Sequence, residues 1–186
     1  MNQGKKQELK NLHHTMILEA ASRLFAQKGY SAVSFDEIAL EAKLVRRTLY
    51  NHFTDKLSLF QSLCEPLLMT AIENLRKVRS ESPLKPDAVW NYLLDLYDEF
   101  GSTLSLMRQI RWTELSKMAV LHERFTADFC ELFRELSEHR SLRLDPEHSA
   151  LLVFKTFGSV CEALPADASR NLLFKAIMQG MLFTVC

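Results

Sequence analysis

The chain has 186 residues, of which 47% are hydrophobic and 25% are charged, so it can bury the core of one or two small globular domains. Its 23 basic side chains balance its 23 acidic side chains, and this zero net charge argues against a protein that coats nucleic acid through charge alone. Residues 1–60 nevertheless carry nine basic and six acidic side chains, so a mildly basic first third (+3) precedes a mildly acidic remainder (−3).

The four cysteines, at positions 64, 130, 161 and 186, lie far apart without a C-x-x-C pair, and no signal peptide precedes them. A reducing, cytoplasmic location is therefore expected. Charged residues interrupt the longest apolar runs, so we expect no membrane span and no membrane partner. Only five glycines and five prolines occur in a chain whose apolar residues follow helical spacing, which predicts an all-α fold.

The first third of the chain has the pattern of short helices. Apolar residues recur every three or four positions over residues 9–25, which predicts a helix that Gly29 ends. Ser34 and Glu37 then match a capping box, in which each side chain bonds the other residue's backbone amide. This pattern predicts a second helix to about residue 42.

A third helix is expected over residues 45–52, with Leu49 facing inward against the second helix. Two short helices joined by a tight turn form a helix-turn-helix. A fourth helix begins at Lys56, and Pro66 either kinks it or starts a new helix. The proline-containing segment 80–87 predicts a loop. The further helices are expected at 87–118, 121–140, 146–163 and 167–185.

The third helix carries residues suited to DNA. In a helix-turn-helix, the second helix enters the major groove with its first residues on the base edges. Two adjacent arginines stand there, and an arginine fork matches guanine while a threonine methyl packs on thymine. Donors later on the helix and at the next helix start suit phosphates, although a solvated surface role is the alternative for Lys56. The predicted base contacts are Arg46, Arg47 and Thr48, and the predicted phosphate contacts are Tyr50, His52, Lys56 and Lys43.

These residues resemble the TetR family of transcriptional regulators. The resemblance covers about residues 15–63, in the segments ILEAASRLFAQKGYSAVSFDEIALEA and RRTLYNHFTDKLSLF. It implies a DNA-binding head over residues 1–56 and a helical effector-binding and dimerisation domain over residues 57–186. It also implies a sequence-specific regulator, usually a repressor that a small-molecule ligand releases from a palindromic double-stranded operator, with no cofactor.

Two positions depart from the family pattern, which usually has glycine in place of Lys43 and serine in place of Val45. Glycine suits the left-handed backbone that closes a helix, where lysine is strained by roughly 1–2 kcal/mol. Serine caps a helix, and valine there loses on the order of 1 kcal/mol. We therefore expect a looser or differently shaped turn, in which Lys43 itself can also reach a phosphate.

The C-terminal helices contain more apolar residues than one buried stripe requires, which predicts both a ligand pocket and a dimer interface. Core packing is the alternative for each aromatic residue, and a tight contact within the chain is the alternative for each helical glycine. The predicted pocket residues are Trp90, Tyr97, Met107, Arg108, Arg111, Trp112, Phe125 and Phe129. The predicted interface residues of a homodimer are Phe154, Phe157, Gly158, Phe174, Ile177 and Met181.

Other functions have weaker support. The pair His122 and Glu123 lacks the second histidine of a zinc-protease helix, so we expect no enzyme. His139, Glu147 and His148 are separated and more typical of a solvated surface than of a metal site. The cysteines have no adjacent basic cluster that would make them reactive. The main alternative is a helical protein-interaction adaptor whose head no longer binds DNA.

Overall fold

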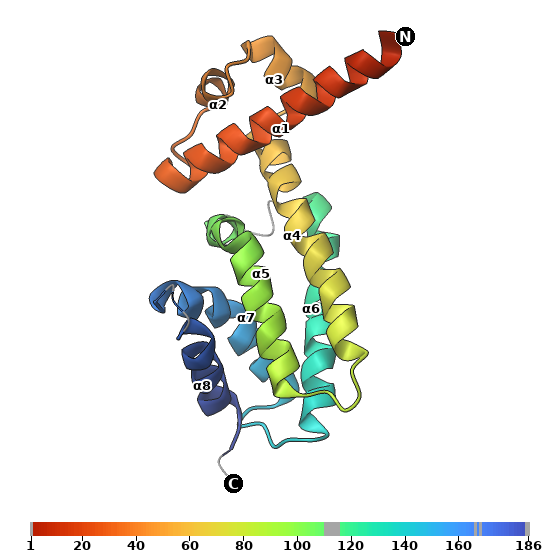
Figure 1. Ribbon diagram of the computed structural model, residues 1–186, viewed down its shortest axis with the longest axis vertical. Coiled ribbons are helices and arrows are strands. Elements are labelled where there is room, and N and C mark those ends of the chain that lie inside the picture. The colour runs from red at the N-terminus through yellow and green to blue at the C-terminus, as the bar shows by residue number, and fades with distance from the viewer. Residues whose placement is uncertain (1, 110–115, 166, 168, 185–186) are drawn as a thin grey trace. The chain divides into compact units, whose positions relative to one another are not determined.

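The computed structural model describes residues 2–109, 116–165, 167 and 169–184, and these residues form eight α-helices (Figure 1). The helices are α1 (Asn2–Lys28), α2 (Phe35–Glu41), α3 (Arg46–His52), α4 (Lys56–Arg79), α5 (Pro86–Met107), α6 (Ser116–Ser137), α7 (Pro146–Ala163) and α8 (Arg170–Leu182). The predicted all-α fold is confirmed. None of these helices is long and apolar enough to cross a membrane.

The chain divides into two compact units. The first unit consists of Met1–Pro66 and Ser105–Ala119, and the second consists of Leu67–Leu104 and Val120–Cys186. Three helices, α4, α5 and α6, therefore have residues in both units. The division into functional domains after residue 56 stays a prediction.

The first unit is built on α1, and α2 and α3 pack both on α1 and on each other. The apolar stripe of α1 is buried from Ile17 to Phe25, and Ile38 of α2 and Leu49 of α3 are fully buried beside it. Burial of one such large side chain contributes about 1.5–3 kcal/mol. Because helices as short as α2 and α3 are marginal by themselves, this shared core is what holds them in place.

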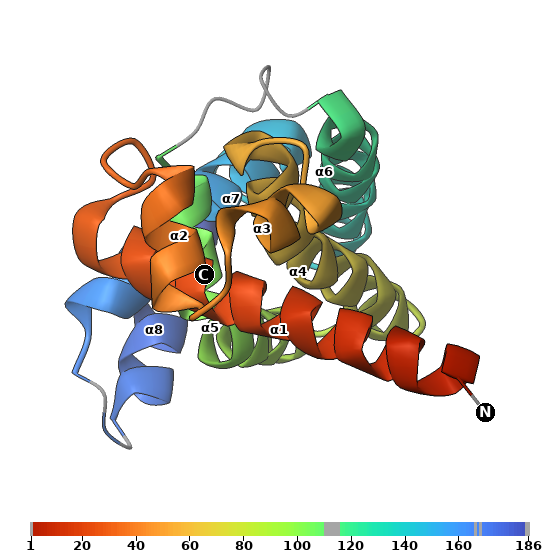
Figure 2. The ribbon, with the colours of Figure 1, turned by 90° about the horizontal axis from the view of Figure 1, so that it is seen from above.

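The N-terminal turns of α1 extend past α3, as both views of the ribbon show (Figures 1 and 2). Leu9 and Leu12 lie on these turns and belong to the same apolar stripe, yet they are 52% and 55% exposed. Helical periodicity identifies the apolar face of a helix, but it does not say how much of that face a neighbour covers.

The second unit has an aromatic core. Trp90 of α5, Phe133 of α6 and Phe174 of α8 are fully buried. The buried hydroxyl of Tyr92 donates a hydrogen bond to the backbone carbonyl of Ala71 in α4 at 3.1 Å. Partners of this kind allow a tyrosine to be buried without leaving its polar group unsatisfied.

The predicted helix over residues 87–118 was wrong at its C-terminal end. Helix α5 ends at Met107, and α6 begins at Ser116 rather than at residue 121. Phe100 also has non-helical backbone angles (φ −126°, ψ 16°) inside α5. No glycine or proline follows Met107 to mark the end, so the apolar periodicity continued across it. The helices predicted at 146–163 and 167–185 are observed as Pro146–Ala163 and Arg170–Leu182.

Helix α4 continues through Pro66. The alternative that a new helix begins at this proline is therefore wrong. Proline has no N–H to donate to the carbonyl four residues earlier, which removes one bond of the helical ladder. Leu59, Phe60, Leu67 and Leu68 are buried on either side of it. This packing holds both halves of α4 in helical geometry.

Candidate DNA-binding site

Helix α2 is fixed at its N-terminus by the predicted capping box. The Glu37 amide donates to the Ser34 hydroxyl at 3.2 Å, and the Ser34 amide donates to the Glu37 carboxylate at 2.8 Å. The Lys28 ammonium of α1 lies 2.8 Å from the same carboxylate. These contacts lower the pKa of Glu37 to about 2, with the Lys28 hydrogen bond as the largest cause. The carboxylate therefore stays charged at every physiological pH.

The turn between α2 and α3 has the geometry expected from its two unusual residues. Lys43 has a positive φ of 57°, in the left-handed region that favours glycine. The Leu44 amide donates to the Ala39 carbonyl at 2.9 Å, which closes the end of α2. Val45 is the residue before α3, and its side chain makes no capping hydrogen bond. Lys43 thus takes the left-handed conformation and Val45 leaves α3 without a side-chain cap, as expected, while a turn looser than the family's stays a prediction.

Helix α3 presents a mainly polar face and buries an apolar one. Arg46, Arg47, Tyr50 and Asn51 are exposed, whereas Thr48 is half-buried. On the opposite face Leu49 is fully buried. The structure thus brings the three predicted base contacts together in the first turn of α3, on a helix that its buried Leu49 attaches to the core.

Arg46 is held in place by two neighbours. Its Nε lies 2.9 Å from a carboxylate oxygen of Asp36 in α2, and its Nη2 donates to the Tyr50 hydroxyl at 3.3 Å. The guanidinium also lies over the Tyr50 ring, 5.5 Å from its centroid. An exposed ion pair of this kind adds little net stability because solvent screens it, so Arg46 can exchange Asp36 for a guanine edge at little cost.

Lys56 has a role that the sequence alone did not indicate. Its ammonium donates to the backbone carbonyls of Tyr30 and Val33, each at 2.8 Å, in the loop between α1 and α2. It also lies over the Tyr30 ring, 4.4 Å from the centroid, and burial lowers its pKa. Lys56 therefore ties this loop to the start of α4, and its phosphate contact stays a prediction. Lys43 is exposed.

His52, a predicted phosphate contact, faces α1 rather than open solvent. Its ring centroid lies 5.8 Å from that of His14 and 6.3 Å from that of His13. His14 in turn stacks on Phe53, with the two ring centroids 5.0 Å apart. Burial, followed by the charges of His14, His13 and Lys10, lowers the pKa of His52. Sequence reasoning missed this cluster because the N-terminal turns of α1 precede the recognised motif.

The described members of the predicted effector pocket are divided between the two units. Trp90, Phe125 and Phe129 are buried in the core of the second unit, in agreement with the core-packing alternative. Met107 and Arg108 belong to the first unit. Tyr97 is half-buried, with the Arg170 guanidinium 5.9 Å from its ring centroid. Arg111 and Trp112 lie outside the described residues, so the pocket stays a prediction.

The predicted interface residues differ in exposure. Phe157, Gly158 and Phe174 are buried within their own chain, and Phe154 and Met181 are half-buried. Ile177 is exposed at 37%. Other apolar side chains on α7 and α8 are more exposed than these, namely Leu151, Leu172 and Leu173 at 44%, 72% and 40%. An exposed apolar surface is present, but it contains only part of the predicted set.

The metal and redox alternatives gain no support. Among the described residues, no group of three or more His, Cys, Asp or Glu side chains is arranged to hold a metal ion. Glu147 pairs with Arg134 at 2.6 Å, and His148 pairs with Asp145 at 2.7 Å. Burial raises the pKa of Cys64 to about 12 and that of Cys161 to about 11, which keeps both thiols protonated and unreactive.

Comparisons with known proteins agree with this geometry. Residues 17–63 match the family described as bacterial regulatory proteins, tetR family. A probable HTH-type transcriptional regulator from Pseudomonas putida, ArpR, is 31% identical over 119 residues, which span 62% of this chain. The matched region covers 53% of ArpR, so the chain spans about half the length of this relative.

Solved structures show the same fold over nearly the whole chain. The ketosteroid transcriptional regulator KstR2 of Mycobacterium tuberculosis has a TM-score of 0.75 at 16% identity, over 92% of this chain and 95% of its own. NalD, the secondary repressor of the MexAB-OprM multidrug efflux pump in Pseudomonas aeruginosa, has a TM-score of 0.66 at 22% identity, over 95% and 98%. The N-terminal helix-turn-helix and the C-terminal helical region therefore occur together in known folds.

Proposed function

Because the chain belongs to the tetR family of bacterial regulatory proteins, which are regulators and not enzymes, we propose that it is a sequence-specific DNA-binding transcriptional regulator. The observation that carries the proposal is the exposed face of α3, where Arg46, Arg47 and Tyr50 stand on a helix whose Leu49 is fully buried. A recognition helix needs one face packed firmly on the protein core and an opposite polar face directed at the DNA, and α3 meets both requirements.

Five residues of α3, and Lys43 in the turn before it, have parts in this proposal. Arg46 and Arg47 read guanine edges, and the Thr48 methyl packs against a thymine. Tyr50 and His52 donate to phosphates and set the position of the helix along the groove. Lys43, exposed at the turn, adds a further phosphate contact.

We further propose that the protein acts as a homodimeric repressor that a small-molecule ligand releases from a palindromic operator. Two observations support a link between a ligand in the helical region and the DNA-binding head. Helices α4 and α5 have residues in both units. In addition, the side chain of Gln109, two residues beyond α5, accepts a hydrogen bond from the Tyr30 amide at 3.1 Å. A ligand that moves α5 would therefore disturb the loop that leads into α2.

The proposal is tested by selecting binding sites from a random duplex library and titrating the enriched duplex by fluorescence anisotropy. We expect a palindromic site, and we expect the double variant Arg46→Ala/Arg47→Ala to bind it at least about thirtyfold more weakly, since each of the two bidentate contacts discriminates by roughly 1–3 kcal/mol. The matched control is Arg76→Ala/Arg124→Ala, which removes two exposed arginines from the second unit.

The control should bind as the wild type does. Failure to enrich any sequence, with and without added apolar ligands, would favour the alternative of a protein-interaction adaptor. Binding that does not depend on sequence or on Arg46 and Arg47 would contradict the assignment of α3 as the recognition helix.

A further inference from the structure

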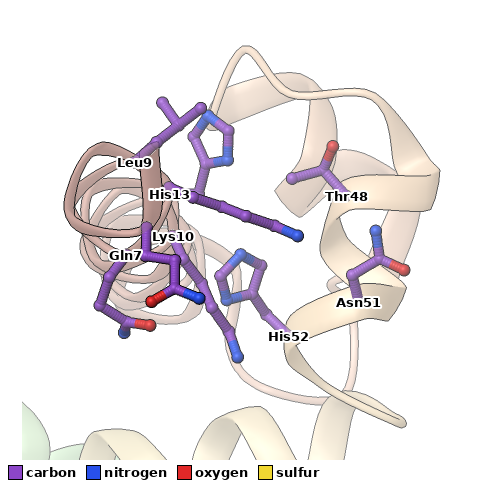
Figure 3. Close-up of a pocket in the computed structure, with 9 residues that line it drawn as sticks. Gln7, Leu9, Lys10, His13, Thr48, Asn51 and His52 are labelled. Carbon is purple, nitrogen blue, oxygen red and sulfur yellow. The ribbon is translucent and has the colours of Figure 1, made fainter. Parts of the chain in front are cut away.

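A groove of about 670 Å³ lies between the N-terminal turns of α1 and the helix α3, within the first unit (Figure 3). Helix α1 contributes Gln3, Lys6, Gln7, Leu9, Lys10 and His13, and α3 contributes Thr48, Asn51 and His52. The family match begins only at residue 17, so the α1 side of this groove lies outside it. The family match therefore assigns no role to the α1 side of the groove.

The lining of the groove is rich in hydrogen-bond donors and contains no carboxylate. Lys6, Lys10 and His13 follow one another at spacings of four and three, which places them on one face of α1. Lysine ammonium groups and the amides of glutamine and asparagine all donate hydrogen bonds, and a protonated histidine donates from both ring nitrogens. Such a lining suits an anion with several acceptor oxygens.

The charges around His52 also favour an anion in the groove. The groups that act on it are His14, His13 and Lys10 of α1, and each of them is either cationic or becomes cationic on protonation. Lys6 lines the same groove. Like charges facing one another repel, so this arrangement is relieved when a negative charge enters between them.

The position of the groove favours a DNA strand over a small free anion as its ligand. Thr48 and Asn51 lie on its α3 side, next to the residues that meet the bases, and the side chains of Lys6 and Lys10 are exposed rather than enclosed. A strand whose bases meet the start of α3 carries its backbone along the flank of that helix.

We propose that this groove seats a phosphate of the DNA backbone, with Lys6, Lys10 and His13 as its contacts, so that the first turns of α1 are part of the DNA-binding surface. The inference rests on the proposed function, because it requires α3 to be the recognition helix. It adds to that function a second point of attachment on the backbone, supplied by residues that precede the family motif.

The test compares two double variants of the full chain on the selected duplex. Lys6→Gln/Lys10→Gln removes two charges that line the groove, and Lys5→Gln/Lys85→Gln removes two exposed charges that do not line it. The dissociation constant of each is measured by anisotropy at several salt concentrations. Each lost phosphate contact reduces the magnitude of the slope of log affinity against log salt by about 0.9. Because a dimer on a palindrome has two grooves, we expect the groove variant to lose about 2 units of slope and about tenfold in affinity.

The control variant should keep the wild-type slope. Equal losses in both variants would show that only the overall charge matters, and an unchanged slope in the groove variant would also overturn the inference. If the wild type itself binds no selected duplex, the proposed function fails, which is a different result. Circular dichroism of each variant checks that the helix content of the chain is unchanged.

A second readout separates a backbone phosphate from a free anion. Inorganic phosphate is titrated against the protein without DNA, and the ring signals of His13 and His52 are followed by NMR. Saturable shifts at submillimolar phosphate would show a small-anion site and would overturn the inference. We expect instead no saturation with phosphate and clear shifts on addition of the duplex, with loss of the shifts in Lys6→Gln/Lys10→Gln.

Discussion

Lys43 occupies the point at which the backbone turns from α2 to α3, and its φ of 57° lies where an L residue is strained. Val45, two residues later, leaves the first amides of α3 without a side-chain cap. We predict that Lys43→Gly/Val45→Ser raises the free energy of unfolding by about 1–2 kcal/mol. Glycine relieves the strain and serine supplies the cap, while the greater freedom of glycine in the unfolded chain offsets about 1 kcal/mol of this gain. In a chain of this size the melting temperature should rise by a few degrees.

The matched control is Lys77→Gly, which places glycine inside α4 and should lower stability by about 1 kcal/mol. An unchanged or lower melting temperature for the Lys43 and Val45 variant would refute the strain argument. The same variant also separates two roles of Lys43. A more stable protein that binds the selected duplex less tightly would show that this lysine contacts a phosphate.

His52 should make the stability of the first unit depend on pH. Its pKa in the folded chain lies below the ordinary histidine value, chiefly because of burial. The unfolded chain therefore binds the proton more strongly, and stability falls as the pH falls through and below the ordinary histidine range. Replacing His52 with glutamine removes this difference. We predict that, between pH 7.5 and pH 5.5, the melting temperature of His52→Gln falls by less than that of the wild type.

Calorimetry at several pH values measures this effect. Glu37 does not interfere, because its lowered pKa of about 2 makes its contribution disappear only in stronger acid. His122 of the second unit also has a pKa lowered by burial, so His122→Gln serves as the control for a histidine outside the head. Parallel pH profiles for wild type and His52→Gln would contradict the prediction.

At the scale of single helices, local signals located most elements. The pair Ser34 and Glu37 identified the start of α2, and Gly29 marked the end of α1 with its positive φ of 80°. These signals succeed because a cap or a left-handed residue acts within one turn of chain. The end of α5 at Met107 carries no such signal, and it was missed.

Helix contacts between distant residues could not be predicted in the same way. The bonds from Lys56 to the carbonyls of Tyr30 and Val33 join residues more than twenty positions apart. The cluster of His13, His14 and His52 likewise exists only once α1 and α3 pack together. Composition indicated basic and aromatic residues in this region, but the partner of each side chain depends on tertiary packing.

At the scale of the whole molecule, the helical fold was predictable and the use of its C-terminal surfaces was not. An apolar residue on a helix can serve the core, a ligand or a second chain, and these uses share one sequence pattern. The structure resolves part of this ambiguity. Phe157 and Phe174 are buried within the chain, whereas Ile177 and Leu173 are exposed. A dimer interface on α8 should therefore use the exposed residues.

Gly180 is informative about such an interface. A side-chain carbon added at this position would meet nothing within 4 Å, so a tight contact inside the chain does not account for the glycine. Leu173, Ile177 and Gly180 follow one another at spacings of four and three, which places them on one face of α8. An exposed apolar face beside a glycine, which has no side chain to keep a neighbour away, allows close approach by the same helix of a second copy.

We predict that Ile177→Glu converts the protein from a dimer to a monomer at micromolar concentration, because the substitution buries an unpaired charge at the interface. The monomer itself should tolerate the change, since Ile177 is 37% exposed. Gly180→Ala should weaken the dimer without harming the single chain. Sedimentation equilibrium measures both effects, with Met69→Glu, at another exposed apolar residue of the second unit, as the control. A dimeric Ile177→Glu would move the interface away from α8, and a monomeric wild type would remove the two-fold axis that a palindromic operator requires.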